Sequence, residues 1–279
     1  MRLTHAASLF AAVASSPFAG AASAGVIITL SQVEGTAPPK PMTMYCDADK
    51  FRMDFDPQGV AVIFRGDLGK MWVLTAKTKT YLEITPETAA RLASAASDAM
   101  ALARQRLAAL PEAQRKQIEA LMASKTPALA ATPPAPPTYE KAGDNRTVGE
   151  WTCAPYRIIA GDKLSGETCI AKIEDLGLTA DDLKPLARYG AFAAKLRAAI
   201  APAGGPLSTG SYDAMRKAIG FDGFPVESKL TIEGGARTLV NTLQSIRHDD
   251  LAAATFDLPE GYTQRDLAAP IGGPPSPQP

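Results

Sequence analysis

The chain has 279 residues, with 29 lysines and arginines against 29 aspartates and glutamates, so its formal net charge is zero. Because it lacks a concentration of positive charge, we do not expect it to bind nucleic acid, whose phosphates attract clustered basic side chains. The length suits one large domain or two lobes.

Residues 1–24 have the layout of a secretory signal peptide. Arg2 precedes an apolar, alanine-rich run that ends in Ala22-Ser23-Ala24, the small-residue pattern of a cleavage site. An ordinary buried N-terminal helix would not need these three parts in this order. The run is shorter than the about 20 apolar residues of a spanning helix, and no second long apolar run follows, so we expect no transmembrane segment. We therefore expect a mature chain that starts near Gly25 and resides in the periplasm or outside the cell.

Residues 25–85 are predicted to form an antiparallel meander of strands. In "DKFRMDFDPQG", Phe51, Met53 and Phe55 alternate with Arg52 and Asp54, which is the period of two typical of a strand. The stretches "GVIITLSQVEG", "GVAVIFRG" and "GKMWVLTAKTKTYLEIT" are rich in β-branched and apolar residues and are bounded by turn residues.

Residues 86–125 are predicted to form a helical arm. Thr85 is a suitable N-cap and Pro86 a suitable first helical residue; an alanine-rich stretch follows, and "PEAQRKQIEALM" begins a second helix. We expect a structural helical hairpin over a sheet rather than a partner-binding coiled coil, because a stripe of alanines makes a weak seam. The Pro-rich stretch 126–138 cannot form a helix or a central strand and is expected to be a linker.

Residues 139–265 repeat the order of strands followed by helix. The stretches "TVGEWTCAPYRIIAG" and "SGETCIAKIE" are predicted strands, and a helix capped by Thr179 follows them. A hairpin is predicted next, turning at Gly234-Gly235. The Pro/Gly-rich tail, residues 266–279, is expected to be disordered.

Two of the three cysteines, Cys153 and Cys169, lie on consecutive strands of a predicted hairpin. A turn centred near Gly161 would place them directly opposite each other, close enough for a disulfide in an oxidising compartment. A redox pair is usually C-x-x-C at the start of a helix, and a zinc site needs three or four ligands, whereas the mature chain adds only His248 and Cys46. A structural disulfide is the best interpretation, and Cys46 is left as a buried thiol or an alternative partner.

No stretch of the chain carries a recognisable catalytic signature. With one histidine in the mature chain, a serine or cysteine nucleophile would have to use His248, which stands in "SIRHDD" beside charged residues typical of a solvated turn. We therefore predict no catalytic residue, no metal site and no cofactor.

Several stretches, in order, resemble one family of exported bacterial proteins, the domain-of-unknown-function family 4412. They are "FRMDF", "KTKTYLEI", "LPEAQRKQIEALM", "TVGEWTCAPYRI", "CIAKIEDLGL", "GFPVESK" and "FDLPEGYTQ", and they span roughly residues 42–265. The family is similar in pattern to the outer-membrane lipoprotein carriers, whose fold is an incomplete antiparallel barrel with helices in its concave face. The resemblance implies that fold and no catalytic residues; the long Ala-rich arm and the Pro-rich linker depart from the carriers.

The predicted fold class is α+β: a single domain, residues 25–265, with a curved antiparallel sheet (an incomplete barrel) in two halves and helices on the concave face. The predicted function is that of an exported, non-enzymatic cell-envelope protein that binds an apolar ligand such as an acyl chain between sheet and helices. The alternatives are an envelope protein-protein interaction module without a ligand, and last a hydrolase with an unrecognised site. Large apolar residues on strands are the candidate ligand-lining residues, although the same residues would suit a plain core: Phe51, Met53, Phe55, Phe64, Trp72 and Leu74.

Overall fold

A computed structural model describes residues 24–112, 114–117, 137–161, 163–200, 212–232 and 237–265. Several predicted features lie outside these residues: residues 1–23 of the signal peptide, most of the second helix of the arm, nearly all of the Pro-rich linker, the Gly234-Gly235 turn and the tail 266–279. No helix in the described segments is long and apolar enough to cross a membrane.

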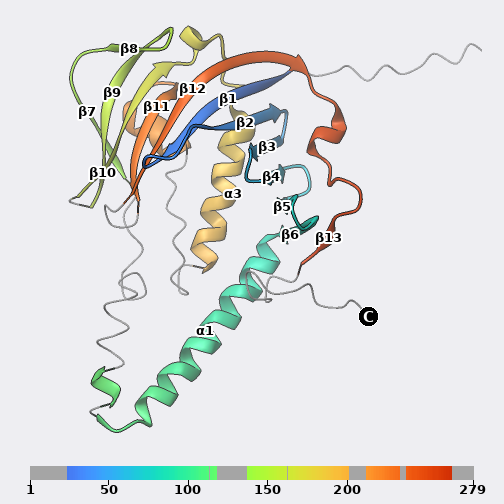
Figure 1. The fold of residues 1–279 in the computed structure, drawn as a ribbon, viewed down its shortest axis with the longest axis vertical. Coiled ribbons are helices and arrows are strands. Elements are labelled where there is room, and N and C mark those ends of the chain that lie inside the picture. Colours follow the sequence, from blue (N-terminus) through green and yellow to red (C-terminus); the bar gives the residue numbers. More distant parts are fainter. Residues whose placement is uncertain are drawn as a thin grey trace, which may run out of the picture.

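Thirteen strands form one large, curved and mostly antiparallel sheet (Figure 1). The first half is a meander of six consecutive strands, which confirms the strands predicted between residues 25 and 85. Their bounds are β1 Ala24–Glu34, β2 Lys40–Asp47, β3 Lys50–Phe55, β4 Val60–Arg65, β5 Lys70–Thr75 and β6 Thr80–Ile84.

The second half of the sheet is built from later strands in the same neighbour-to-neighbour manner. Its order is β12-β11-β10-β9-β7, and β8 pairs with β9 beside β7. The bounds are β7 Thr138–Lys141, β8 Arg146–Val148, β9 Trp151–Ala160, β10 Lys163–Lys172, β11 Gly223–Ile232 and β12 Arg237–Asp250.

The two halves join through β1 and β12, which pair antiparallel over eleven residue pairs from Ala24↔Asp250 to Glu34↔Leu239. The sheet therefore runs continuously from the edge of one half to the edge of the other and does not close on itself within the described chain. This confirms an unclosed, curved antiparallel sheet in two halves.

The helices with complete bounds among the described residues are α1, α3 and α4. The first, α1 (Pro86–Ala108), begins as predicted, because the Thr85 hydroxyl accepts a hydrogen bond from the Thr88 backbone N–H in a reciprocal capping box. The second, α3 (Lys184–Ile200), begins later than predicted: Thr179 closes a turn with Asp182. Pro185 fits only the first turn of a helix, which explains the start at Lys184. The third is α4 (Tyr212–Ile219).

Helix α3 packs against one face of the first half, which we call the α3 face. Tyr189 stacks on Phe51 with 5.0 Å between ring centroids, and Phe192 lies 5.2 Å from Phe64. Helix α4 covers the other face of the sheet, in the second half. Met215 of α4 packs with Ile170 of β10 in one apolar cluster. Cys169 and Ala171, on either side of Ile170 in the strand, point to the opposite face and belong to the core under α3. The prediction that the helices occupy the concave side stays a prediction.

The face of the first half opposite α3 is covered by the C-terminal segment 251–265, which we call the strap. Phe256, in the short 3-10 helix η5 (Ala253–Phe256), is fully buried against Ile63, Trp72 and Leu74. Arg52 donates to the backbone carbonyl of Thr255 at 2.9 Å. The strap ends in β13 (Thr263–Gln264), which pairs parallel to β6 and covers that edge of the sheet (Figure 1).

The predicted disulfide is present, joining Cys153 to Cys169 with 5.4 Å between their Cα atoms. The predicted register is wrong, because Cys169 stands opposite Pro155 rather than Cys153. Ala160 pairs with Lys163, which displaces the pairing by one residue from a turn centred on Gly161, and a register shift between Leu164 and Gly166 displaces it by one more. The bond therefore joins a diagonal pair. Cys46 is a buried free thiol.

We expect Cys153→Ser to lower the stability of the protein under oxidising conditions by about 3 kcal/mol, because the bond removes loop-closure entropy from the unfolded chain. Equilibrium urea unfolding with and without reductant measures this difference. Cys46→Ser is the matched control and should retain the parent's dependence on reductant, because it leaves the disulfide intact. If the parent protein unfolds at the same urea concentration in both conditions, the disulfide does not stabilise it.

Candidate functional site

The register of the first half arranges the side chains of the α3 face in rows that cross the strands. The row nearest α3 contains Phe51, Phe64, Met71 and Ile84, paired in that order. The first three are at most 7% exposed. These three are core under α3, whereas Ile84 is half-buried at the end of the row.

The next two rows lie farther along the strands and are only half-buried. Met53 pairs with Val62, Val62 with Val73, and Val73 with Leu82, while Phe55 pairs with Val60 in the row beyond. Six apolar side chains on four neighbouring strands therefore form a continuous, partly exposed surface beside the core. We call it the apolar strip: Met53, Phe55, Val60, Val62, Val73 and Leu82.

The structure does not bring the six predicted lining residues together. Phe51 and Phe64 are buried in the core, and Met53 and Phe55 are in the apolar strip. Trp72 and Leu74 lie on the opposite face under the strap, so placing them in the same site was wrong. The reason is strand alternation: Trp72 pairs with Ile63, the neighbour of Phe64, and therefore points the other way.

Trp72 has polar partners that fit this position. Its indole Nε1 donates to the Glu83 carboxylate at 2.9 Å, and the Lys70 ammonium lies 5.0 Å from its ring centroid.

Sequence analysis missed the other members of the strip, Val60, Val62 and Val73 among them. Both phases of "GVAVIFRG" and "MWVLT" are apolar, so the sequence does not show which residues face α3.

A small apolar pocket of about 50 Å³ lies where α1 and α3 meet. Pro86 and Ala89 line it from α1, and Phe192, Lys195 and Leu196 line it from α3. Its volume is well below the roughly 150 Å³ of an engineered cavity that binds benzene. The pocket alone cannot hold an acyl chain.

A larger hollow of about 260 Å³ lies at the other end of α3 and is polar. It is lined by Cys46, Asp47, Asp49 and Asp182 among others. Burial, with a contribution from Asp182, raises the pKa of the Cys46 thiol to about 12, so this thiol is protonated and unreactive at neutral pH. None of the predicted ligand-lining residues borders this hollow.

The geometry around His248 fits a structural role. Its Nε2 lies 3.3 Å from Oδ2 of Asp182, which also accepts hydrogen bonds from the Thr179 backbone N–H and hydroxyl. Burial acts to raise the pKa of Asp182, but the hydrogen bonds from Thr179 and His248 outweigh it and hold the pKa below its usual value. The described residues contain no group of three or more His, Cys, Asp or Glu that could hold a metal ion.

No protein-family model matches the sequence, and no curated protein matches it. The resemblance to family 4412 is therefore not confirmed and stays a prediction. Similar solved structures include an uncharacterized conserved protein from Thermus thermophilus, with TM-score 0.40 and 10% identity over 87% of this chain and 90% of that one.

Two further solved structures are similar to this chain. A domain from Vibrio parahaemolyticus assigned to outer membrane lipoprotein sorting has TM-score 0.31 and 12% identity, over 83% of this chain and 88% of that one. A LolA superfamily protein from Nitrosomonas europaea has TM-score 0.25 and 6% identity, over 84% and 90%. Likenesses at this distance carry no argument about function.

The difference between core and strip predicts different costs for the same substitution. Phe51→Ala should destabilise the protein by about 3–5 kcal/mol, as for a fully buried aromatic, whereas Phe55→Ala should cost about 1 kcal/mol, as for a typical partly exposed site. Equilibrium denaturation of the two variants measures both. Equal costs would mean that Phe55 is ordinary core and that the strip offers no surface to a ligand.

Proposed function

We propose that the protein is an exported, non-enzymatic component of the cell envelope that holds a single apolar chain, such as an acyl chain, along the apolar strip. The observation that carries the proposal is the exposure pattern of the α3 face. Three large apolar side chains of one row, Phe51, Phe64 and Met71, are buried, and the adjoining rows are half-buried and continuous with them.

The energetics of such a site rest on burial of apolar surface. The antiparallel pairing of β3 to β6 satisfies the backbone polar groups within the sheet, so the strip presents side chains rather than unpaired amides. Each methylene group of a chain that becomes buried contributes about 0.8 kcal/mol. A chain of ordinary length lying across four strands would bind without any charged contact.

The arrangement of the elements supports the choice of this face. In Figure 1 the sheet curves around α3, which supports α3 as the helix on the concave side. The opposite face of the first half is occupied by the strap, with Phe256 fully buried there. Export is supported by the leader pattern of residues 1–24 and by the Cys153–Cys169 disulfide, a bond that persists in oxidising compartments.

Calorimetric titration of the delipidated mature protein with dodecanoic acid or a lysophospholipid tests the proposal. We expect saturable binding, and a loss of at least about tenfold in affinity for Val62→Asp, since a carboxylate in the strip must be desolvated by the bound chain. Leu68→Asp is the matched control: Leu68 is 52% exposed in the β4–β5 turn, outside the strip, and should bind like the parent.

A fluorescence readout requires a new reporter, because Trp72 lies on the wrong face. Phe55→Trp places an indole in the strip, and its emission should shift to shorter wavelength and saturate as the chain binds. Circular dichroism confirms that each variant is folded. Folded, delipidated protein that binds no chain of any length would contradict the proposal and leave the envelope interaction module as the better hypothesis.

A further inference from the structure

We propose that the first half of the sheet docks on an anionic phospholipid surface through one end, formed by the turns 56–59 and 76–79 together with Lys40. We call it the basic end. The proposal rests on the proposed function only in one respect, that an acyl chain binds along the apolar strip. The docking itself depends on the charges and positions of these turns.

The topology brings these segments to the same end of the sheet. In an antiparallel meander alternate turns lie at the same end, so the β3–β4 turn and the β5–β6 turn are neighbours. A hydrogen bond of 2.7 Å from the Ala76 backbone N–H to the Gly59 carbonyl joins them directly. Lys40 begins β2 at this end, two residues before Met42 and therefore on the α3 face.

The charge at this end is predominantly positive and unpaired. Its turns and Lys40 carry three lysines, Lys40, Lys77 and Lys79, against the carboxylate of Asp56. The strap adds Glu260, three residues before Thr263, whose backbone N–H donates to the Lys79 carbonyl. Among the described residues none of the three lysines has an ion pair, and Lys77 and Lys79 are exposed.

Several charged side chains at the other end of the same strands are paired instead. Arg65 contacts Asp67 at 2.7 Å, Lys70 contacts Glu83 at 3.3 Å, and Asp49 contacts Arg188 at 2.5 Å. Lys50, also at this other end, has no ion pair among the described residues and lies 5.8 Å from the ring centroid of Phe256 instead. What distinguishes the basic end is that its lysines gather in adjoining segments beside the apolar strip.

The apolar strip reaches the basic end. Phe55 and Val60 flank the 56–59 turn and belong to the last row of the strip. Cationic side chains beside the end of an apolar surface match the layout of a phospholipid, whose anionic head group sits next to its acyl chains. Lysines near an anionic bilayer each strengthen binding about fivefold, and this attraction weakens as salt increases.

The 76–79 turn has an unusual residue in its last position. The turns 56–59, 66–69 and 76–79 all span four residues, and the first two end in glycines with positive φ, Gly59 at 66° and Gly69 at 60°. Lys79 adopts the same left-handed conformation with φ 49°, which glycine adopts more readily. Lys79→Gly therefore removes a charge without opposing the fold, which makes it a clean test variant.

Co-sedimentation with vesicles tests the docking. We expect the mature protein to bind phosphatidylcholine vesicles that contain phosphatidylglycerol, to bind pure phosphatidylcholine weakly, and to dissociate as salt is raised. The double variant Lys77→Gln/Lys79→Gly should bind the anionic vesicles about 30-fold more weakly. The matched control Lys163→Gln/Lys217→Gln, which removes two exposed lysines from β10 and α4, should bind like the parent.

Three outcomes would overturn the docking: equal binding to neutral and anionic vesicles, an equal loss in the control pair, or a loss that follows Leu68→Asp at the opposite end instead. Calorimetry with soluble lysophosphatidylcholine separates this proposal from the proposed function. The Lys77→Gln/Lys79→Gly variant should still bind that zwitterionic chain. Chain binding without vesicle binding refutes only the docking, whereas vesicle binding without chain binding refutes only the proposed function.

Discussion

The pairing of β1 with β12 is the constraint on which the rest of the structure depends. It joins the beginning and the end of the described domain over eleven residue pairs and makes one sheet of two meanders. The residues that point to the α3 face from these strands, such as Val26, Ile28 and Leu243, lie in the main core. At the start of β1, Gly25 makes room for Leu251, which follows β12, since a Cβ there would stand 2.5 Å from the Leu251 Cδ1. This seam gives the two meanders a common core.

Much of the fold could be predicted from the sequence, because each strand carries its own periodic signal. The meander, the Thr85 cap and the Cys153–Cys169 bond follow from local patterns. Which residues of neighbouring strands share a face does not follow from local patterns. Turns and bulges set this register, as the shift after Leu164 shows. Both faces of β5 are buried, by the core on one side and the strap on the other. Its sequence "KMWVLT" is therefore apolar throughout its middle and cannot say which residues share a face with Phe51.

The strap was not foreseen for a related reason. Residues 251–265 follow neither a helical nor a strand period. Their position is therefore set by tertiary contacts of individual residues, which local sequence patterns do not reveal. Arg65 contacts Asp257 at 2.7 Å, Lys50 lies 5.8 Å from the ring centroid of Phe256, and the Thr263 backbone N–H donates to the Lys79 carbonyl. These contacts fix the outer face of the first half and leave the α3 face to carry its partly exposed apolar side chains.

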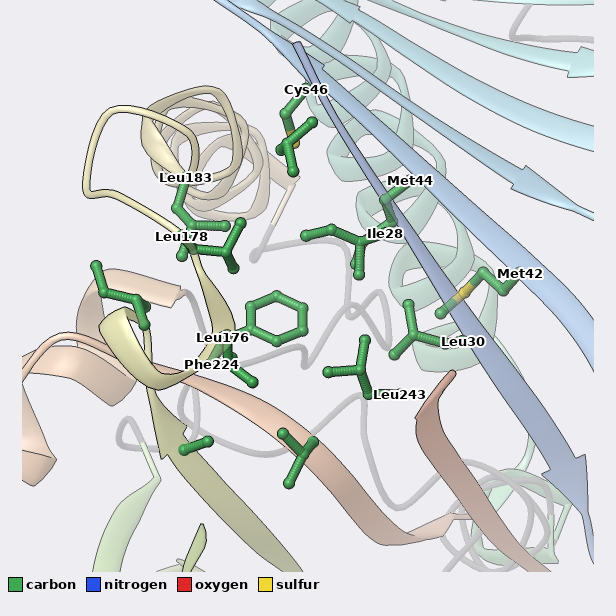
Figure 2. Packing of buried hydrophobic residues seen from close by; sticks show 14 of the residues in the cluster. Ile28, Leu30, Met42, Met44, Cys46, Leu176, Leu178, Leu183, Phe224 and Leu243 are labelled. Carbon is green, nitrogen blue, oxygen red and sulfur yellow. The ribbon is translucent and has the colours of Figure 1, made fainter. Parts of the chain in front are cut away.

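The exposure gradient along the α3 face has a physical cause in the two-half architecture. On β1 and β2 the second row, Ile28 and Met44, is buried, because residues after β10 and on β11 face it, as Figure 2 shows for Leu178 and Phe224. On β3 to β6 the same row, from Met53 to Leu82, is half-buried. The apolar strip thus begins where the second half stops covering the first. The core is covered over β1 and β2 and partly exposed over β3 to β6. An apolar chain lying over β3 to β6 would therefore add to the existing apolar layer, and no core side chains would have to move apart to admit it.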